Sequence, residues 1–178
     1  ATRTAFENLV QLAIDEAVGF VVLAGDVYDG GWKDYNTGLF FHRQLARMTA
    51  AGIRVVLLHG NHDAANRMTR GLEPPAGVHV FETARPSTVT FDELGVALHG
   101  QGFATAAVET DLAAGYPDPV PGLVNIGVLH TSLSGRPPHA VYAPCSVVDL
   151  ASRGYDYWAL GHVHAFEEVS ADPLTIYP

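Results

Sequence analysis

The stretch Phe20-Val21-Val22-Leu23-Ala24-Gly25-Asp26 joins an unbroken apolar run to a glycine and a carboxylate. A short run without polar residues is typical of a strand that is buried on both faces. A second buried strand is predicted at Ile53–Leu58, and it leads in the same way into Gly60-Asn61-His62-Asp63. Two buried strands that each end in a polar turn predict a sheet whose strand ends carry the chemistry.

A helix is predicted ahead of each apolar run. Apolar residues recur at helical spacing from Phe6 to Ala17, and Gly19 is the natural end of that helix. A second helix is predicted from near Asp34 to Ala51, with Gly52 as its stop. Helices that alternate with buried strands predict an α/β sheet with crossover connections.

The rest of the chain holds shorter and more closely spaced elements. Strands are predicted at Val78–Phe81, Thr88–Phe91, Val96–His99, Leu123–Leu129 and Tyr155–Leu160, helices at Ala104–Ala114 and Val147–Ser152, and a final hairpin at Glu167–Ser170 and Leu174–Tyr177. No repeat and no long linker divides the chain, so residues 1–178 are interpreted as one domain.

The composition fits a globular enzyme. Hydrophobic residues make up 48% of the chain and charged residues 16%, which argues against disorder. The net charge of −9 argues against a surface that coats nucleic acid, although bound cations would reverse the charge locally. No apolar run is long enough to span a bilayer, and no signal peptide is expected. The one cysteine, Cys145, is interpreted as a packed or loop thiol in a reducing cytoplasm.

Four polar side chains each follow a separate predicted strand. They are Asp26, Asn61, His130 and His162. Ligands of open α/β sheets bind beyond the carboxyl ends of the strands, so these groups converge if the strands run parallel or meet at one edge. Oxygen and imidazole ligands without a thiolate suit Mn²⁺, Fe²⁺ or Zn²⁺. Two such ions can clamp the attacking and leaving oxygens of a phosphate ester.

Glycines precede three of these groups, at Gly25, Gly60 and Gly161, and they permit tight turns and close backbone approach. Each motif also has a structural interpretation when it is taken alone. Gly-Asp-x-x-Asp and Gly-Asn-His-Asp can be turns, and His-x-His occurs on unrelated surfaces. Their common order after buried strands favours a hydrolytic metal centre. His42, His59, His79, His99 and His139 are given structural roles.

The motifs Gly25-Asp26-Val27-Tyr28-Asp29, Gly60-Asn61-His62-Asp63, the lone His130 and Gly161-His162-Val163-His164 resemble those of the calcineurin-like metallophosphoesterases. Within that superfamily the chain is similar to the SbcD-type DNA-repair exonucleases. The resemblance covers nearly the whole chain. It implies a four-layer α/β/β/α sandwich with two mixed sheets packed face to face.

The resemblance also implies a role for each residue of the site. Asp26 would bridge two divalent ions, Mn²⁺ being favoured. Asn61, His130 and His162 would complete the protein ligands of the second ion, and His164 would bind the first.

The same resemblance assigns the catalytic pair. His62 would stabilise charge on the scissile phosphate or protonate the leaving oxygen. Asp29 would orient the His62 ring by accepting a ring N–H.

The chain departs from the family pattern at its start. Family members begin with a strand that carries an Asp-x-His motif for the first ion, and no such motif precedes Gly25. The core is therefore expected to be truncated at both ends, without that strand and without the C-terminal capping region. The second ion is expected to bind better than the first, which keeps only Asp26 and His164.

Three functions remain open from the sequence. The first is a nuclease for DNA ends that works with an SbcC-type coiled-coil ATPase, with a homodimer as a further possibility. The second is a phosphoesterase for small molecules, such as a cyclic nucleotide or a phosphomonoester, which the few basic residues favour. The third is a scaffold whose metal ligands have decayed, although truncation explains the missing motif more simply.

Overall fold

The computed structural model describes residues 2–27, 35–65, 73–133 and 141–178. Its helices and strands in chain order are α1 (Thr2–Asp15), β1 (Phe20–Leu23), α2 (Tyr35–Ala50), β2 (Arg54–Leu57), α3 (Asn61–Ala65), β3 (Val78–Val80), β4 (Ser87–Phe91), β5 (Val96–Gly100), β6 (Val124–His130), α4 (Val147–Ser152), β7 (Tyr157–Gly161), β8 (Glu167–Ala171) and β9 (Leu174–Tyr177). Short 3-10 helices lie at Asp92–Leu94 and Ala113–Gly115.

The strands form two sheets. The first sheet has the order β1-β2-β3, and the second has the order β4-β5-β6-β7-β9-β8. The second sheet is mixed, as predicted, because β4 and β8 run antiparallel to their neighbours. In the first sheet, by contrast, the described strands pair only in parallel, so the expectation of a mixed sheet does not hold there. Parallel pairing follows from the crossover through α2 that joins β1 to β2.

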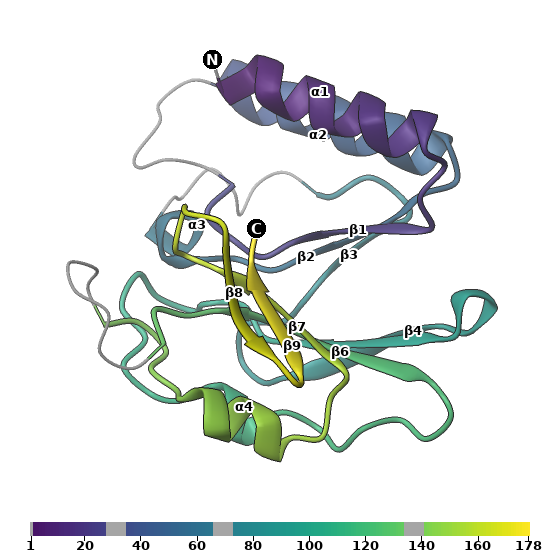
Figure 1. Cartoon of the computed structure of the whole chain (residues 1–178). Coiled ribbons are helices and arrows are strands. Elements are labelled where there is room, and N and C mark those ends of the chain that lie inside the picture. The colour runs from purple at the N-terminus through teal and green to yellow at the C-terminus, as the bar shows by residue number, and fades with distance from the viewer. Residues whose placement is uncertain (1, 28–34, 66–72, 134–140) are drawn as a thin grey trace.

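Four layers stack in the order helices, sheet, sheet, helix (Figure 1). Three buried clusters fill the spaces between them. The cluster between α1, α2 and the first sheet includes Val10, Leu45 and Val55. The cluster between the sheets joins Val56 to Val128, and the cluster under α4 joins Leu150 to other buried side chains of the second sheet. The predicted α/β/β/α sandwich is confirmed.

Side chains along β2 alternate between two buried clusters, one on each face of the first sheet. Val55 and Leu57 lie in the cluster beneath the helices, whereas Val56 and Leu58 lie in the cluster between the sheets. Successive residues of a strand point to opposite faces, so a strand between two apolar layers needs an apolar residue at every position. The apolar run Val55–Leu58 in the sequence has this physical cause.

Helices α1 and α2 end at turns of different kinds. Helix α2 ends at Ala50, and Gly52 is its stop as predicted, where φ is +83° and the Ile53 N–H donates to the Met48 carbonyl. Helix α1 ends before the predicted Gly19. Ala17 takes the left-handed conformation with a φ of +48°, and the Val18 N–H donates to the Ala13 carbonyl. Apolar packing at the end of α1 therefore outweighs the preference for glycine at the turn.

One predicted helix is wrong. Residues 104–114 hold only the start of the 3-10 helix Ala113–Gly115. Most of this segment is exposed, so a helix there would bury no apolar stripe, and short isolated helices are marginal in water. The Val108 carbonyl instead accepts a hydrogen bond from the Ala143 N–H, which ties the segment to residues far along the chain.

The remaining elements agree with the sequence. Strands β8 and β9 pair as the predicted antiparallel hairpin at one edge of the second sheet. Cys145 is buried, and burial raises the pKa of its thiol to about 12, so it is the packed thiol that was predicted. Within the described part of the chain, no helix has the length and apolar character that crossing a membrane requires.

Candidate metal centre

The candidate centre lies where strands of both sheets end. Asp26 follows β1, and Asn61 opens α3 just after β2. His130 is the last residue of β6, and His162 directly follows β7. Strands β1 and β2 are parallel, as are β6 and β7, whose register pairs His130 with Gly161. The carboxyl ends of these four strands therefore present their polar residues to one another.

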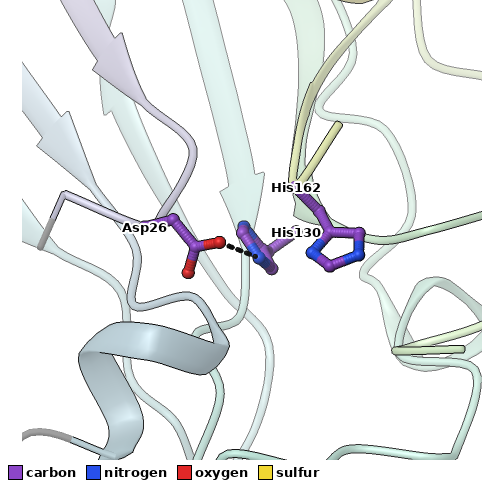
Figure 2. Close-up of side chains that lie close together, drawn as sticks. All are labelled: Asp26, His130 and His162. Atoms are coloured by element: carbon purple, nitrogen blue, oxygen red, sulfur yellow. Dashed lines mark ion pairs between the residues drawn. The ribbon is translucent and has the colours of Figure 1, made fainter. Parts of the chain in front are cut away.

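Close contacts join the four side chains. The Nε2 atom of His130 lies 3.2 Å from an Asp26 carboxylate oxygen and 2.9 Å from Oδ1 of Asn61. One potential ligand atom from each of Asp26, His130 and His162 lies within 4.8 Å of the others. Figure 2 shows the Asp26 carboxylate pointing toward the His130 ring, with the His162 ring beside it. The structure thus brings together four of the five residues predicted as metal ligands.

The hydrogen bonds of the His130 ring indicate what this cluster can bind. Nδ1 lies 2.9 Å from the Ala24 carbonyl oxygen, and a carbonyl only accepts. Nδ1 therefore donates to this carbonyl, and Nε2 is the ring atom that faces the Asp26 and Asn61 oxygens. One ring nitrogen and two side-chain oxygens that converge in this way fit a divalent cation. Nitrogen and oxygen donors without a thiolate suit Mn²⁺, Fe²⁺ or Zn²⁺.

The Asp26 carboxyl is held in its charged form. Burial alone would raise its pKa, but the His130 ring and the backbone N–H of His62 outweigh burial, so the pKa lies below its ordinary value. The His62 N–H donates to Oδ1 of Asp26 at 3.0 Å. A carboxylate that is ionised before a cation arrives is the form that a metal site requires.

Several residues at or beside the candidate centre have strained backbone conformations. Asp26 has a φ of +52° and His162 a φ of +98°, and both are non-glycine residues in a conformation that side chains disfavour. Leu133 and Ala143, in the segments beside β6 and α4, have φ values of +51° and +40°. Strained residues of this kind persist where the surrounding structure holds them, and they cluster at functional sites.

The two sheets meet closely at glycines. A Cβ atom on Gly161 would lie 1.9 Å from the Ala24 carbonyl oxygen, and a Cβ on Gly60 would lie 2.4 Å from Oδ1 of Asp26. Both distances are far inside van der Waals contact, so only glycine allows the loops to approach this closely. The predicted role of these glycines in close backbone approach is confirmed.

Asp63 holds two of the site loops together. Its Oδ2 accepts hydrogen bonds from the Gly60 N–H at 3.0 Å and from the Val27 N–H at 3.4 Å. The side chain is buried, and it links the loop after β1 to the start of α3. From the sequence, Asp63 could be interpreted as a capping residue, but its bond to the other loop could not be foreseen because that loop is distant in the chain.

Two aromatic side chains at the centre were also missed. The Phe103 ring meets the His130 ring at a centroid distance of 5.2 Å, and the Tyr142 ring meets the His162 ring at 5.4 Å. Both residues lie in irregular segments between strands. No motif or spacing marks them, so only the folded chain identifies them.

Neither His164 nor His62, the other two predicted site residues that the structure describes, belongs to the group of Asp26, His130 and His162. His164 is exposed. His62 is half-buried on α3 and contacts Asp26 through its backbone. Asp29 lies outside the described residues.

The family model of the calcineurin-like phosphoesterases matches residues 1–166, which carry every motif described above. The chain belongs to this family. Calcineurin-like phosphoesterases are hydrolases that bind divalent metals, in agreement with the cation-fitting cluster. The predicted superfamily is therefore confirmed.

Curated relatives of this calcineurin-like phosphoesterase include a Bacillus subtilis protein described as uncharacterized metallophosphoesterase YhaO. It is 34% identical over 182 residues, which cover 100% of this chain and 45% of the relative. DNA double-strand break repair proteins Mre11 from Methanopyrus kandleri and Thermoplasma acidophilum are each 27% identical, over 92% and 97% of this chain and 39% and 48% of their own lengths. The chain thus spans less than half the length of each of these three relatives.

Proposed function

We propose that this chain is the core of a metal-dependent phosphodiester hydrolase, a DNA exonuclease of the SbcD type that acts on DNA ends in repair. The observation that carries the proposal is the convergence of the Asp26 and Asn61 oxygens on Nε2 of His130, with a His162 ring nitrogen close by. Hydrolysis of a phosphate diester needs positive charge beside the phosphate, and this cluster is built to hold it.

Asp26, Asn61, His130 and His162 would hold one divalent ion, and Asp26 and His164 would contribute to a second. Mn²⁺ is the favoured ion, and Fe²⁺ or Zn²⁺ fits the same donors. Bound divalent ions supply Lewis-acid polarisation of the phosphate and a nucleophile at neutral pH. The ionised Asp26 carboxylate and the fixed His130 tautomer prepare the site for such an ion.

His62 would act on the phosphate from the start of α3. In this role its imidazole stabilises charge on the phosphate oxygens or protonates the leaving oxygen. The Asp29 carboxylate would accept an N–H of the His62 ring and fix its orientation. A positioned general acid of this type contributes about 10²- to 10⁴-fold to a rate.

Similarity to two proteins named for DNA double-strand break repair supports DNA as the substrate. The chain has few basic residues, so a separate subunit would supply much of the grip on DNA. We propose an SbcC-type coiled-coil ATPase as that partner, a homodimer of the nuclease subunit as a further assembly, and the cytoplasm as the compartment.

A small-molecule phosphoesterase is the second candidate, and the net charge of −9 favours it. A cyclic nucleotide or a phosphomonoester carries little charge, so its binding does not need an extended basic surface. The same metal cluster would serve both substrates because substrate choice lies in the surrounding loops and domains.

Degradation of end-labelled linear double-stranded DNA tests the first candidate. We expect the protein to degrade the DNA in the presence of Mn²⁺ and to stop after addition of a chelator. His62→Ala should lose about 10²-fold or more of the rate while it still binds Mn²⁺. His42→Ala, a change on the distant helix α2, is the matched control and should keep full activity.

A small-molecule phosphoesterase would give a different result in these assays. Mn²⁺-dependent release of nitrophenol from a small diester, with no degradation of DNA in the presence or absence of an ATPase partner, would select the small-molecule enzyme. Mn²⁺ binding without turnover of any phosphate ester would contradict both candidates.

A further inference from the structure

Four rings from separate segments form a closed cycle around the centre. His130 lies at the end of β6, and His162 follows β7. Phe103 follows β5, and Tyr142 precedes α4. Each ring contacts the next, in the order His130, His162, Tyr142, Phe103 and back to His130.

The contacts in this cycle are edge to face. The planes of Phe103 and His130 meet at 84° with centroids 5.2 Å apart, and those of Tyr142 and His162 meet at 87° with centroids 5.4 Å apart. Phe103 and Tyr142 close the cycle at 6.5 Å and 65°. Ring pairs prefer this geometry because the positive edge of one ring meets the negative face of another.

The two aromatic residues are themselves fixed by backbone hydrogen bonds. The Phe103 N–H donates to the His59 carbonyl at 2.7 Å, and the side chain is fully buried. The Tyr142 N–H donates to Oγ of Ser132 at 3.0 Å, and the Ser132 N–H donates back to the Tyr142 carbonyl. Phe103 and Tyr142 therefore form a rigid wall against which the imidazoles lie.

His162 has particular need of such support. Its φ of +98° is unfavourable for a residue with a side chain. Within the described residues, the His162 ring contacts the rings of His130 and Tyr142. A ring on a strained backbone can point its nitrogen at a cation only if its neighbours hold its plane.

We infer that Phe103 and Tyr142 are positioning residues that set the ring planes of His130 and His162 for a divalent cation. The inference rests on the proposed metal site, and it adds two residues that neither touch the cation nor occur in the motifs. Tyr142 acts through its ring and not through its hydroxyl, because its contact with His162 is one of ring edge to ring face. Loss of that ring lets His162 rotate without opening the core, since Tyr142 is only half-buried.

The test is the affinity for Mn²⁺ measured by calorimetry on the metal-free protein, together with urea unfolding of the same samples. Tyr142→Leu should weaken Mn²⁺ binding by about three- to tenfold, because the free energy of one edge-to-face ring pair corresponds to a change in affinity of that size. Tyr142→Phe keeps the ring and should bind as the wild type does. Tyr157→Leu, the same loss of a half-buried ring at the other end of β7, should change the stability alone.

The possible results distinguish a failure of this inference from a failure of the proposed function. The ring-positioning role would be overturned if Tyr142→Leu bound Mn²⁺ with wild-type affinity, or if Tyr142→Phe bound Mn²⁺ as weakly as Tyr142→Leu. Either result would leave the proposed metal site unaffected. Phe103→Leu provides a second check on the other imidazole, and wild-type affinity for that variant would also count against the role. A wild-type protein that binds no Mn²⁺ would overturn the proposed function and the inference with it.

Discussion

Replacement of Gly161 by alanine should separate the two sheets at the candidate centre. The new Cβ would lie 1.9 Å from the Ala24 carbonyl oxygen, which is a backbone atom and cannot turn aside. Ordinary contact needs about 3.5 Å, so the end of β1 and the end of β7 must move apart by about 1.5 Å. The same Cβ would lie 3.0 Å from Nδ1 of His130.

The cost of this change has two parts. Forcing a methyl group into a packed site typically costs about 1–3 kcal/mol. The displacement also weakens the hydrogen bond that the His130 ring donates to Ala24, which is worth about 1 kcal/mol. We therefore expect Gly161→Ala to lower the free energy of unfolding by about 2–4 kcal/mol. Because Asp26 moves away from His130, Mn²⁺ affinity should fall by at least about tenfold.

Urea unfolding and a calorimetric Mn²⁺ titration measure the two effects. Gly115→Ala is the matched control, since the nearest atom to its Cβ is a Pro86 side-chain carbon at 3.8 Å and the change should be nearly neutral. If Gly161→Ala matches Gly115→Ala to within about 0.5 kcal/mol and binds Mn²⁺ as the wild type does, the reasoning from sheet approach at the site is refuted.

Three further predictions concern parts of the fold that support the centre. Ala17→Gly should raise the free energy of unfolding by about 0.5–1 kcal/mol in urea, because Ala17 ends α1 in a left-handed conformation that glycine adopts without strain. Asp63→Ala should lower the free energy of unfolding by about 1–3 kcal/mol, because the variant loses a buried carboxylate that accepts hydrogen bonds from the Gly60 and Val27 N–H groups. Stability should also fall as the pH drops below about 6.5, because burial lowers the pKa of His99 and of His79 in the fold, so that the unfolded chain binds more protons there. His99→Gln should flatten this dependence between pH 7.5 and 5.5, as followed by urea unfolding.

Each of these predictions can fail in a defined way. Ala17→Gly with a lower midpoint than the wild type would show that the left-handed conformation at this position carries no strain. Asp63→Ala with unchanged stability would show that its two hydrogen bonds contribute nothing net. A stability that rises on acidification from pH 7.5 to 5.5 would contradict the sign derived for buried His99 and half-buried His79.

Much of the fold could be predicted because burial leaves a direct pattern in the sequence. Strands β1 and β2 lie between two apolar layers, so Phe20–Leu23 and Val55–Leu57 had to be apolar and the runs were clear. Gly52 marked the end of α2 because its φ of +83° strongly favours glycine. Local physics and tertiary packing agree at these places.

Prediction failed where tertiary contacts outweighed local preference. The alanine-rich residues 104–114 have a high intrinsic preference for helix, but Val108 pairs with Ala143 and most of the segment is exposed. The early end of α1 at Ala17 depends on the packing of Val18 against the helices, which a local pattern does not report.

The residues that converge at the candidate centre could be predicted from the sequence, but the residues that hold them in place could not. Asp26 and His162 stand in motifs next to glycines, and their spacing after strands indicated convergence. Phe103 and Tyr142 belong to irregular segments whose positions depend on bonds to His59 and Ser132. Such long-range contacts have no signature in the sequence of a single protein.

Calorimetric titration of the metal-free protein with Mn²⁺ tests the central claim most directly. The account predicts one tight ion per chain, an affinity lowered by about 10- to 100-fold or more in His130→Gln and Asp26→Asn, and no change in His42→Gln. Wild-type affinity in both His130→Gln and Asp26→Asn would contradict the assignment of the centre to the ends of β1 and β6.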